Sequence, residues 1–136
     1  MRPFHFAFKV KDIESTRKFY VEILSCSEGI STEHWIDFDF FGNQLSAHIS
    51  NSIPAPDYCG TVDGVSVPIP HFGCVFSIVQ FEQVQKNMEE QNIEFIIKPQ
   101  KRYENKKGEQ FTMFVLDFSG NPLEFKAFIN EDEIFM

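Results

Sequence analysis

Four side chains able to bind a divalent metal ion stand at related places in this sequence. His5 and His71 each open an apolar segment, whereas His48 and Glu124 each follow a Gly-Asn pair by a few residues. Two histidines and one carboxylate form a known Fe(II) site, which leaves coordination positions open for substrate and oxygen. Mn, Ni, Co and Zn also bind such ligands, and spacing does not choose among these ions. The candidate metal ligands are therefore His5, His71 and Glu124, with His48 nearby.

These candidates recur because the chain repeats itself. Residues 5–10 (HFAFKV) resemble residues 71–76 (HFGCVF), and residues 39–45 (DFFGNQL) resemble residues 117–123 (DFSGNPL). Hydrophobic periodicity predicts the same βαβββ order in both halves, with a tight turn at Gly42-Asn43 in the first. The first half is expected to hold strands over 4–10, within 26–33, and over 35–41 and 44–50, with a helix over 13–24. The second half is expected to hold strands over 71–78, 93–99, 110–117 and 123–128, with a helix over 81–91.

Alternation along the predicted strands decides which way the polar candidates point. Phe6 and Phe8 are expected to pack under the first helix, which turns His5 to the opposite face of its strand. A single histidine on a strand is more often an ordinary polar residue than a ligand, but the shared parity favours ligands here. The same parity places these further residues on the faces away from the helices: Ser46, His48, His71, Glu124 and Lys126.

Length and pattern together predict one α+β domain covering residues 1–136. Module 1 spans about 3–51, a linker 52–70, module 2 about 71–128, and a tail 129–136. The linker contains four prolines and shows little periodicity. Each predicted sheet carries a helix on one face only. Two such sheets side by side would form a half-open, barrel-like sheet around a metal cleft.

Composition limits the partners of the chain. Its 136 residues are 43% hydrophobic, include 17 Phe, and carry a formal net charge of −8. This charge argues against a nucleic-acid surface, since phosphate binding requires clustered Lys and Arg. No apolar run reaches the length of a membrane span, so no membrane partner is expected. Three cysteines without a C-x-x-C pair fit a reducing, cytoplasmic compartment.

The chain resembles the vicinal oxygen chelate superfamily, which includes glyoxalases, extradiol dioxygenases, and fosfomycin- and bleomycin-resistance proteins. The resemblance spans residues 3–128 and rests on the His5 strand with Asp12-Ile13, Phe19-Tyr20 and Leu24 after it, the His71 strand, and D-F-S-G-N-P-L-E ending at Glu124. It implies paired βαβββ modules, a divalent metal held by His5, His71 and Glu124, a small-molecule substrate and a homodimer. The modules pair within one chain or between two chains, and the sequence leaves both arrangements open.

Further residues gain candidate roles from this resemblance, from their places on the predicted strands and from their polarity. Many relatives supply a fourth ligand from the last strand of the first module, and aligning the two Gly-Asn turns puts that position at Ser46 rather than His48. His48 lies two residues further along the same face, where it is either a ligand in a slightly different register or a candidate for acid–base catalysis or a hydrogen bond to substrate, because an imidazole titrates near neutral pH. The substrate-binding candidates are Ser46, Thr112, Trp35 and Tyr103. The polar segment 98–108 is a candidate mobile lid.

The leading prediction is a metal-dependent enzyme that chelates a small oxygenated molecule, either a dioxygenase or a glyoxalase-like lyase or isomerase. The alternative is a non-catalytic protein that sequesters a drug or metabolite. A purely structural dimer module would give no reason for the polar set on the faces away from the helices. Only three arginines are present, which argues against glutathione and other highly anionic substrates.

Overall fold

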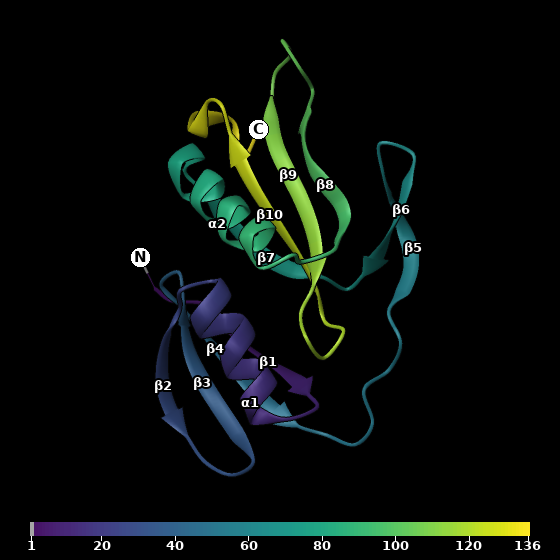
Figure 1. Ribbon diagram of the computed structural model, residues 1–136. Coiled ribbons are helices and arrows are strands. Elements are labelled where there is room, and N and C mark those ends of the chain that lie inside the picture. Colours follow the sequence, from purple (N-terminus) through teal and green to yellow (C-terminus); the bar gives the residue numbers. More distant parts are fainter. Residues whose placement is uncertain (1) are drawn as a thin grey trace. The chain divides into compact units, whose positions relative to one another are not determined.

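The computed structural model describes residues 2–136, which form two compact units (Figure 1). The first unit comprises the described residues up to Ala55 together with Asp117–Asn121. The second unit comprises Pro56–Leu116 and Pro122–Met136. Each unit contains both helix and sheet, which confirms the predicted α+β class. Within residues 2–136, no helix is both long enough and apolar enough to cross a membrane.

The first unit is a four-stranded sheet accompanied by one helical segment. Strands β1 and β4 run parallel, whereas β4 with β3 and β3 with β2 are antiparallel, in the order β1-β4-β3-β2. Helix α1 starts after Asp12, whose side chain accepts a hydrogen bond from the backbone N–H of Ser15. The elements are β1 (His5–Val10), α1 (Ile13–Arg17), the π-helical η1 (Lys18–Ile23), β2 (Ser27–Ser31), β3 (Trp35–Phe40) and β4 (Asn43–Ile49).

The β3–β4 hairpin turns at Phe41 and Gly42, one residue earlier than the predicted Gly42-Asn43. Both residues have positive φ, 53° and 90°, as a two-residue hairpin turn of type I′ requires. The Asp39 carboxylate accepts the backbone N–H of Gly42 at 2.7 Å. Asn43 instead begins β4, and its side-chain oxygen accepts the backbone N–H of Phe4 at 2.9 Å.

A buried hydrogen bond joins the helical segment of the first unit to the turn Asp117–Asn121. The Tyr20 hydroxyl donates to Asp117 Oδ2 at 2.7 Å, and both side chains are buried. Asp117 Oδ1 also accepts the backbone N–H groups of Ser119 and Asn121, each at 2.8 Å. Burial raises the pKa of Asp117, and these hydrogen bonds offset only part of the rise. The D-x-x-G-N turn is therefore organised by its own aspartate, whose charge depends on these donors.

The second unit repeats the sheet of the first. Its strands lie in the order β7-β10-β9-β8, with β7 and β10 parallel. The helix begins at Ile78 rather than at the predicted residue 81, because Ser77 supplies the N-cap. It buries Phe81, Val84 and Met88 and contacts β7 and β10. The elements are β7 (Phe72–Phe76), α2 (Ile78–Glu90), β8 (Phe95–Arg102), β9 (Gln110–Leu116), β10 (Pro122–Phe128) and a short 3₁₀ helix, η2 (Glu131–Glu133), in the predicted tail.

Strand registers establish which residues of the two units are equivalent. In the first unit, Ser46 pairs with the residue that lies two positions after His5. In the second unit, Glu124 pairs with the residue that lies two positions after His71. Ser46 is therefore the structural counterpart of Glu124, as the aligned Gly-Asn turns predict. The predicted tandem βαβββ repeat is confirmed in the order of its elements and in its register.

The segment 52–70, expected to be an irregular linker, contains a β-hairpin. Its strand residue Val67 packs against Ile97 and Phe114 in a small buried cluster of the second unit. At the tip of the hairpin, Asp63 Oδ2 accepts a hydrogen bond from Arg102 Nε at 3.1 Å. Prolines and glycines interrupt the alternation that would have predicted these strands. The two strands are β5 (Asp57–Val62) and β6 (Val65–Ile69).

The segment 98–108, expected to be a mobile lid, begins as regular structure. Strand β8 continues through Arg102 and pairs with β9 along this stretch. Only the turn between β8 and β9 remains outside the sheet, and the lid hypothesis applies at most to that turn.

The Tyr20–Asp117 hydrogen bond predicts a specific loss of stability. Tyr20→Phe removes one donor from a buried carboxylate, so we expect the free energy of unfolding to fall by about 1–3 kcal/mol. Urea denaturation measures this change. Tyr58→Phe is the matched control, because Tyr58 is exposed, and it should change stability by less than about 0.5 kcal/mol. Equal losses in both variants would contradict the assigned role of the hydrogen bond.

Candidate functional site

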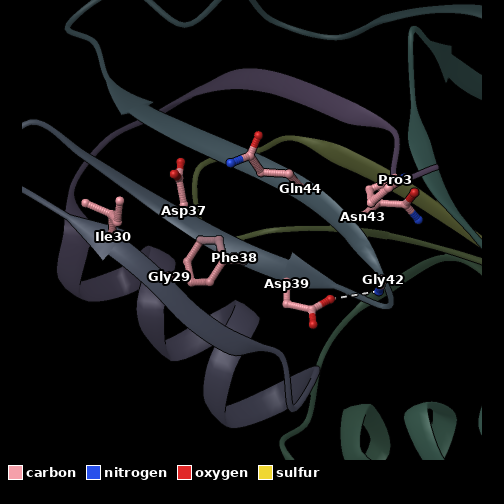
Figure 2. A pocket seen from close by; sticks show the side chains of 9 residues that line it. All are labelled: Pro3, Gly29, Ile30, Asp37, Phe38, Asp39, Gly42, Asn43 and Gln44. Atoms are coloured by element: carbon pink, nitrogen blue, oxygen red, sulfur yellow. Dashed lines mark hydrogen bonds between the residues drawn. The ribbon is translucent and has the colours of Figure 1, made fainter.

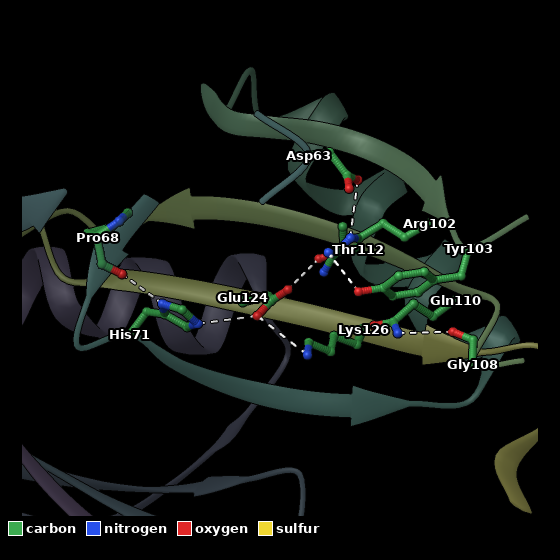
Figure 3. Close-up of polar contacts among 10 residues, drawn as sticks. All are labelled: Asp63, Pro68, His71, Arg102, Tyr103, Gly108, Gln110, Thr112, Glu124 and Lys126. Atoms are coloured by element: carbon green, nitrogen blue, oxygen red, sulfur yellow. Dashed lines mark hydrogen bonds and ion pairs between the residues drawn. The ribbon is translucent and has the colours of Figure 1, made fainter. Parts of the chain in front are cut away.

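His71 is held through both of its ring nitrogens (Figure 3). Nδ1 lies 2.7 Å from the backbone oxygen of Pro68. A carbonyl oxygen can only accept, so Nδ1 carries a proton and Nε2 is the nitrogen left to bind a metal. Nε2 lies 3.2 Å from Glu124 Oε1. The ring also makes an edge-to-face contact with Phe114, with 4.9 Å between centroids, which helps to fix its orientation.

Glu124 is a buried carboxylate surrounded by donors from its own strand and from two other segments. Its Oε2 accepts the Thr112 hydroxyl at 2.6 Å, and its Oε1 lies 3.9 Å from Lys126 Nζ as well as facing His71. Burial would raise the pKa of Glu124, but the hydrogen bonds from His71 and Thr112 and the charge of Lys126 outweigh it, so the pKa is lowered. The hydrogen bond with Glu124 in turn raises the pKa of His71. Glu124 is thus an ionised, oriented acceptor at neutral pH.

The separation of His71 and Glu124 suits two ligands of a single ion. With metal–ligand bonds of about 2.1 Å, neighbouring ligand atoms lie about 3.0 Å apart in an octahedral shell and about 3.4 Å apart in a tetrahedral one. The observed distance from Nε2 to Oε1 is 3.2 Å. A cavity of about 220 Å³ adjoins the pair and is also lined by Gly73 and Lys126. The donor atoms therefore fit a divalent metal, which His71 Nε2 and a Glu124 oxygen would hold.

Gly73 permits the close approach of β7 to β10 beside this pair. A Cβ atom placed on Gly73 would lie 1.5 Å from the backbone oxygen of Glu124, a distance that no side chain tolerates. Glycine at this position keeps the strand pairing intact directly opposite Glu124.

The predicted ligands of the first unit do not converge within that unit. His5 is exposed on β1, and His48 is exposed on β4, where it stacks on Trp35 with 6.1 Å between ring centroids. His48 pairs with the residue four positions after His5, which places the two about 13 Å apart along the strands. Among residues 2–136, no three His, Cys, Asp or Glu side chains form a group that could hold a metal ion. His71 and Glu124 are the two predicted ligands that the structure brings together.

The substrate-binding candidates of the second unit lie in contrasting settings. Thr112 is fully buried and donates to Glu124, so it positions that carboxylate. Tyr103 is 49% exposed in the turn after β8, and its hydroxyl oxygen accepts a hydrogen bond from Arg102 Nη2 at 3.1 Å. A role for Tyr103 in substrate binding stays a prediction.

The candidates of the first unit share the face of β3 and β4 that points away from the helix. Trp35 is half-buried and covers His48. Ser46 is buried, and its hydroxyl donates to Asp37 Oδ1 at 2.6 Å. Roles for Trp35 and Ser46 in substrate binding also stay predictions.

Two groups at these sites, the Pro68 carbonyl and the Asp37 carboxylate, are not identified by the sequence analysis. The Pro68 carbonyl that orients His71 is a backbone atom in a region expected to be irregular, so no side-chain pattern points to it. Asp37 alternates with the core residues Ile36 and Phe38, a position that by itself indicates only a polar residue on the other face of the strand. Its pairing with Ser46 required the register of the hairpin, although the common parity of the two residues was a usable signal.

No family model matches the chain, and no curated protein matches it. Solved structures do match it closely. A glyoxalase/bleomycin resistance protein/dioxygenase from Alicyclobacillus acidocaldarius is 30% identical, with 98% of this chain and 96% of that chain covered and a TM-score of 0.80. A genomically encoded fosfomycin resistance protein from Listeria monocytogenes is 17% identical, with 95% and 93% covered and a TM-score of 0.71. A glyoxalase family protein from Enterococcus faecalis is 23% identical, with 90% and 94% covered and a TM-score of 0.65.

The two modules share one strand register, as the resemblance found in the sequence implies. The match to the Alicyclobacillus protein agrees with that resemblance. The chain belongs to the vicinal oxygen chelate superfamily. At the lower identities, the fosfomycin resistance and Enterococcus proteins show that the fold is shared. Membership defines the architecture, whereas the reaction must be argued from the site.

For a metal ion held by His71 and Glu124, the hydrogen bond from Thr112 to Glu124 predicts an effect on affinity. Thr112→Val preserves the side-chain shape but removes the hydroxyl that orients the carboxylate, so we expect metal affinity to fall about 10–100-fold. Isothermal titration with Zn²⁺ or Mn²⁺ measures the effect. Thr112→Ser is the control, because it keeps the hydroxyl while losing the methyl group, and it should bind metal within a few-fold of the wild type. Equal affinity in the Val and Ser variants would contradict this role for Thr112.

Proposed function

We propose that this protein is a metal-dependent enzyme of the glyoxalase/dioxygenase type that acts on a small oxygenated molecule. His71, Glu124 and His5 would bind a divalent ion (Fe, Mn, Ni, Co or Zn), with His5 coming from the same chain or from a second copy. The observation that carries the proposal is the arrangement of His71 and Glu124. Their donor atoms are 3.2 Å apart, and the Pro68 carbonyl leaves Nε2 of His71 available to a metal.

The residues around Glu124 have separate roles in the proposed chemistry. A bound divalent cation supplies Lewis acidity, which stabilises negative charge on an oxygen of the chelated substrate. Thr112 holds one oxygen of Glu124 and leaves the other toward His71. Lys126 lines the adjacent cavity, where its ammonium group favours an anionic intermediate.

His48 is proposed as the proton-transfer group of the first unit. It is exposed at one end of β4, and Trp35 stacks against its ring and limits its orientations. Imidazole side chains can exchange a proton with a substrate, which is the role proposed for His48.

The assembly and compartment complete the proposal. A homodimer is proposed from the resemblance to the superfamily and from the strand β1, which lies at an edge of its sheet and presents His5. A cytoplasmic location is supported by three cysteines that form no disulfide within residues 2–136.

One observation favours a second function, the sequestration of a drug or metabolite without catalysis. The Glu124 carboxylate is already compensated by His71 and Lys126 without any metal ion. Such a compensated pair can serve as a polar lining of a binding site. The two functions differ in whether the protein takes up metal.

The deciding experiment is elemental analysis of protein purified without an affinity tag, before and after anaerobic reconstitution. We expect near-stoichiometric metal in the wild type and a loss of most of it in His5→Ala, His71→Ala and Glu124→Gln. His34→Ala is the matched control, because His34 is an exposed histidine outside the proposed set, and it should retain the metal. A wild type that stays metal-free after reconstitution would favour the sequestering function. Metal retained in all three ligand variants would place the ion elsewhere.

A further inference from the structure

A second cavity lies in the first unit and shares no residue with the His71–Glu124 pair. Its volume is about 400 Å³, and its lining residues come from the N-terminal segment, β2, β3, the β3–β4 turn and β4. Figure 2 shows that Asp37 and Gln44 point away from the helix, into the open side of the sheet. Gln44 is the pairing partner of His5, so the cavity adjoins a proposed metal ligand.

Asp37 is one of two carboxylates that line this cavity. Its Oδ1 accepts the Ser46 hydroxyl at 2.6 Å, and Ser46 is itself only 7% exposed. This short bond from a buried donor fixes the orientation of the carboxylate. Within residues 2–136, Asp37 forms no ion pair, and no Lys, Arg or His lines the cavity. The second carboxylate of the cavity, Asp39, is occupied by the turn, where it accepts the Gly42 N–H.

Comparison with the equivalent position in the second unit shows what is unusual about Asp37. Asp37 pairs with Ser46, and its counterpart Phe114 pairs with Glu124. In the second unit, Glu124 lies among the positive or hydrogen-bonding groups of its own chain. In the first unit the carboxylate is Asp37, which lies on the neighbouring strand β3. The chain supplies Asp37 with the hydroxyl of Ser46 but with no cation. A partly buried carboxylate of this kind is best satisfied by a positive group from outside the chain.

The remaining lining suits an apolar molecular body beside that positive group. Pro3 and Ile30 contribute carbon surface to the cavity. Gly29 leaves space beside Asp37, because a Cβ there would come within 3.2 Å of the Asp37 Cβ. The formal net charge of −8 adds a long-range attraction for cations.

We propose that this cavity binds a small molecule with a protonated amine on an apolar body, and that the amine forms an ion pair with Asp37. The site goes beyond the proposed metal centre, because none of its lining residues is among the three proposed ligands. It would serve an enzyme as a subsite for one end of the substrate, and a sequestering protein as the main recognition element.

The test is an NMR titration of the protein in EDTA with three probes of similar shape: 2-phenylethylamine, 2-phenylethanol and 3-phenylpropionate. We expect the amine to shift backbone amide resonances of residues 29–44 and to bind about 10-fold or more tightly than the alcohol, with the carboxylate weakest. Equal affinity for the three probes, or shifts confined to other residues, would overturn the proposal. This comparison uses the wild-type chain, so it does not depend on how a variant folds.

The residue assignment is tested by Asp37→Asn, which should reduce the affinity for the amine to that for the alcohol. Glu22→Gln is the matched control, since it removes one exposed negative charge from the same unit outside the cavity and should change the affinity less than about two-fold. Equal weakening in both variants would show a general charge effect and would overturn the role of Asp37. EDTA separates this test from the metal proposal. Amine binding by a protein that takes up no metal would contradict only the proposed enzyme, whereas metal uptake without selectivity for the amine would contradict only this inference.

Discussion

The ionised, buried carboxylate of Glu124 on β10 is the constraint on which the second unit depends. A buried charge is costly unless donors surround it, and Glu124 is only 8% exposed. Its donors come from β9, from β10 and from the residue before β7, so one side chain ties together segments far apart in sequence. The Pro68 carbonyl extends this network to the end of the β5–β6 hairpin. The network leaves Glu124 Oε1 facing His71 Nε2. A bound metal ion would replace the hydrogen bond between these two atoms.

Metal binding at this pair, as proposed, would have an electrostatic consequence. The hydrogen bond between His71 and Glu124 favours a proton on Nε2, because the carboxylate raises the pKa of the imidazole. A metal must displace that proton, since only the unprotonated nitrogen can coordinate it. The fixed Nδ1 hydrogen bond to Pro68 lessens the rearrangement, because the ring is already in the required orientation. The metal-free and metal-bound forms can therefore share the same side-chain positions.

The two units show how one backbone register carries different chemistry. Ser46 and Glu124 are equivalent in register, as are Asp37 and Phe114. In the second unit, the Glu124 carboxylate lies beside His71, and Phe114 occupies the paired position on β9. In the first unit, the Ser46 hydroxyl replaces the carboxylate of Glu124, and the Asp37 carboxylate replaces the ring of Phe114. The carboxylate of the first unit is thus displaced by one strand, and it is hydrogen-bonded to Ser46, the counterpart of Glu124.

Much of this arrangement was predictable from the sequence, because strand parity and the repeated Gly-Asn turn are local signals. They placed His71 and Glu124 on one face of the sheet and identified Ser46 as the counterpart of Glu124. The β5–β6 hairpin was not predictable in the same way. Its prolines and glycines weaken the alternation, and it is held by nonlocal contacts such as that of Val67 with Phe114. The pairing of Asp37 with Ser46 and the carbonyl behind His71 depend on register and on backbone position, which residue types alone do not encode.

The most direct test of the central claim is the anomalous diffraction signal of a crystal grown with Mn²⁺ or Zn²⁺. We expect a peak about 2.0–2.3 Å from both His71 Nε2 and a Glu124 oxygen. We also expect His5, from the same or a second copy of the chain, to complete the set. A peak away from these atoms, or none while Nε2 remains bonded to Glu124, would contradict a metal centre at this pair.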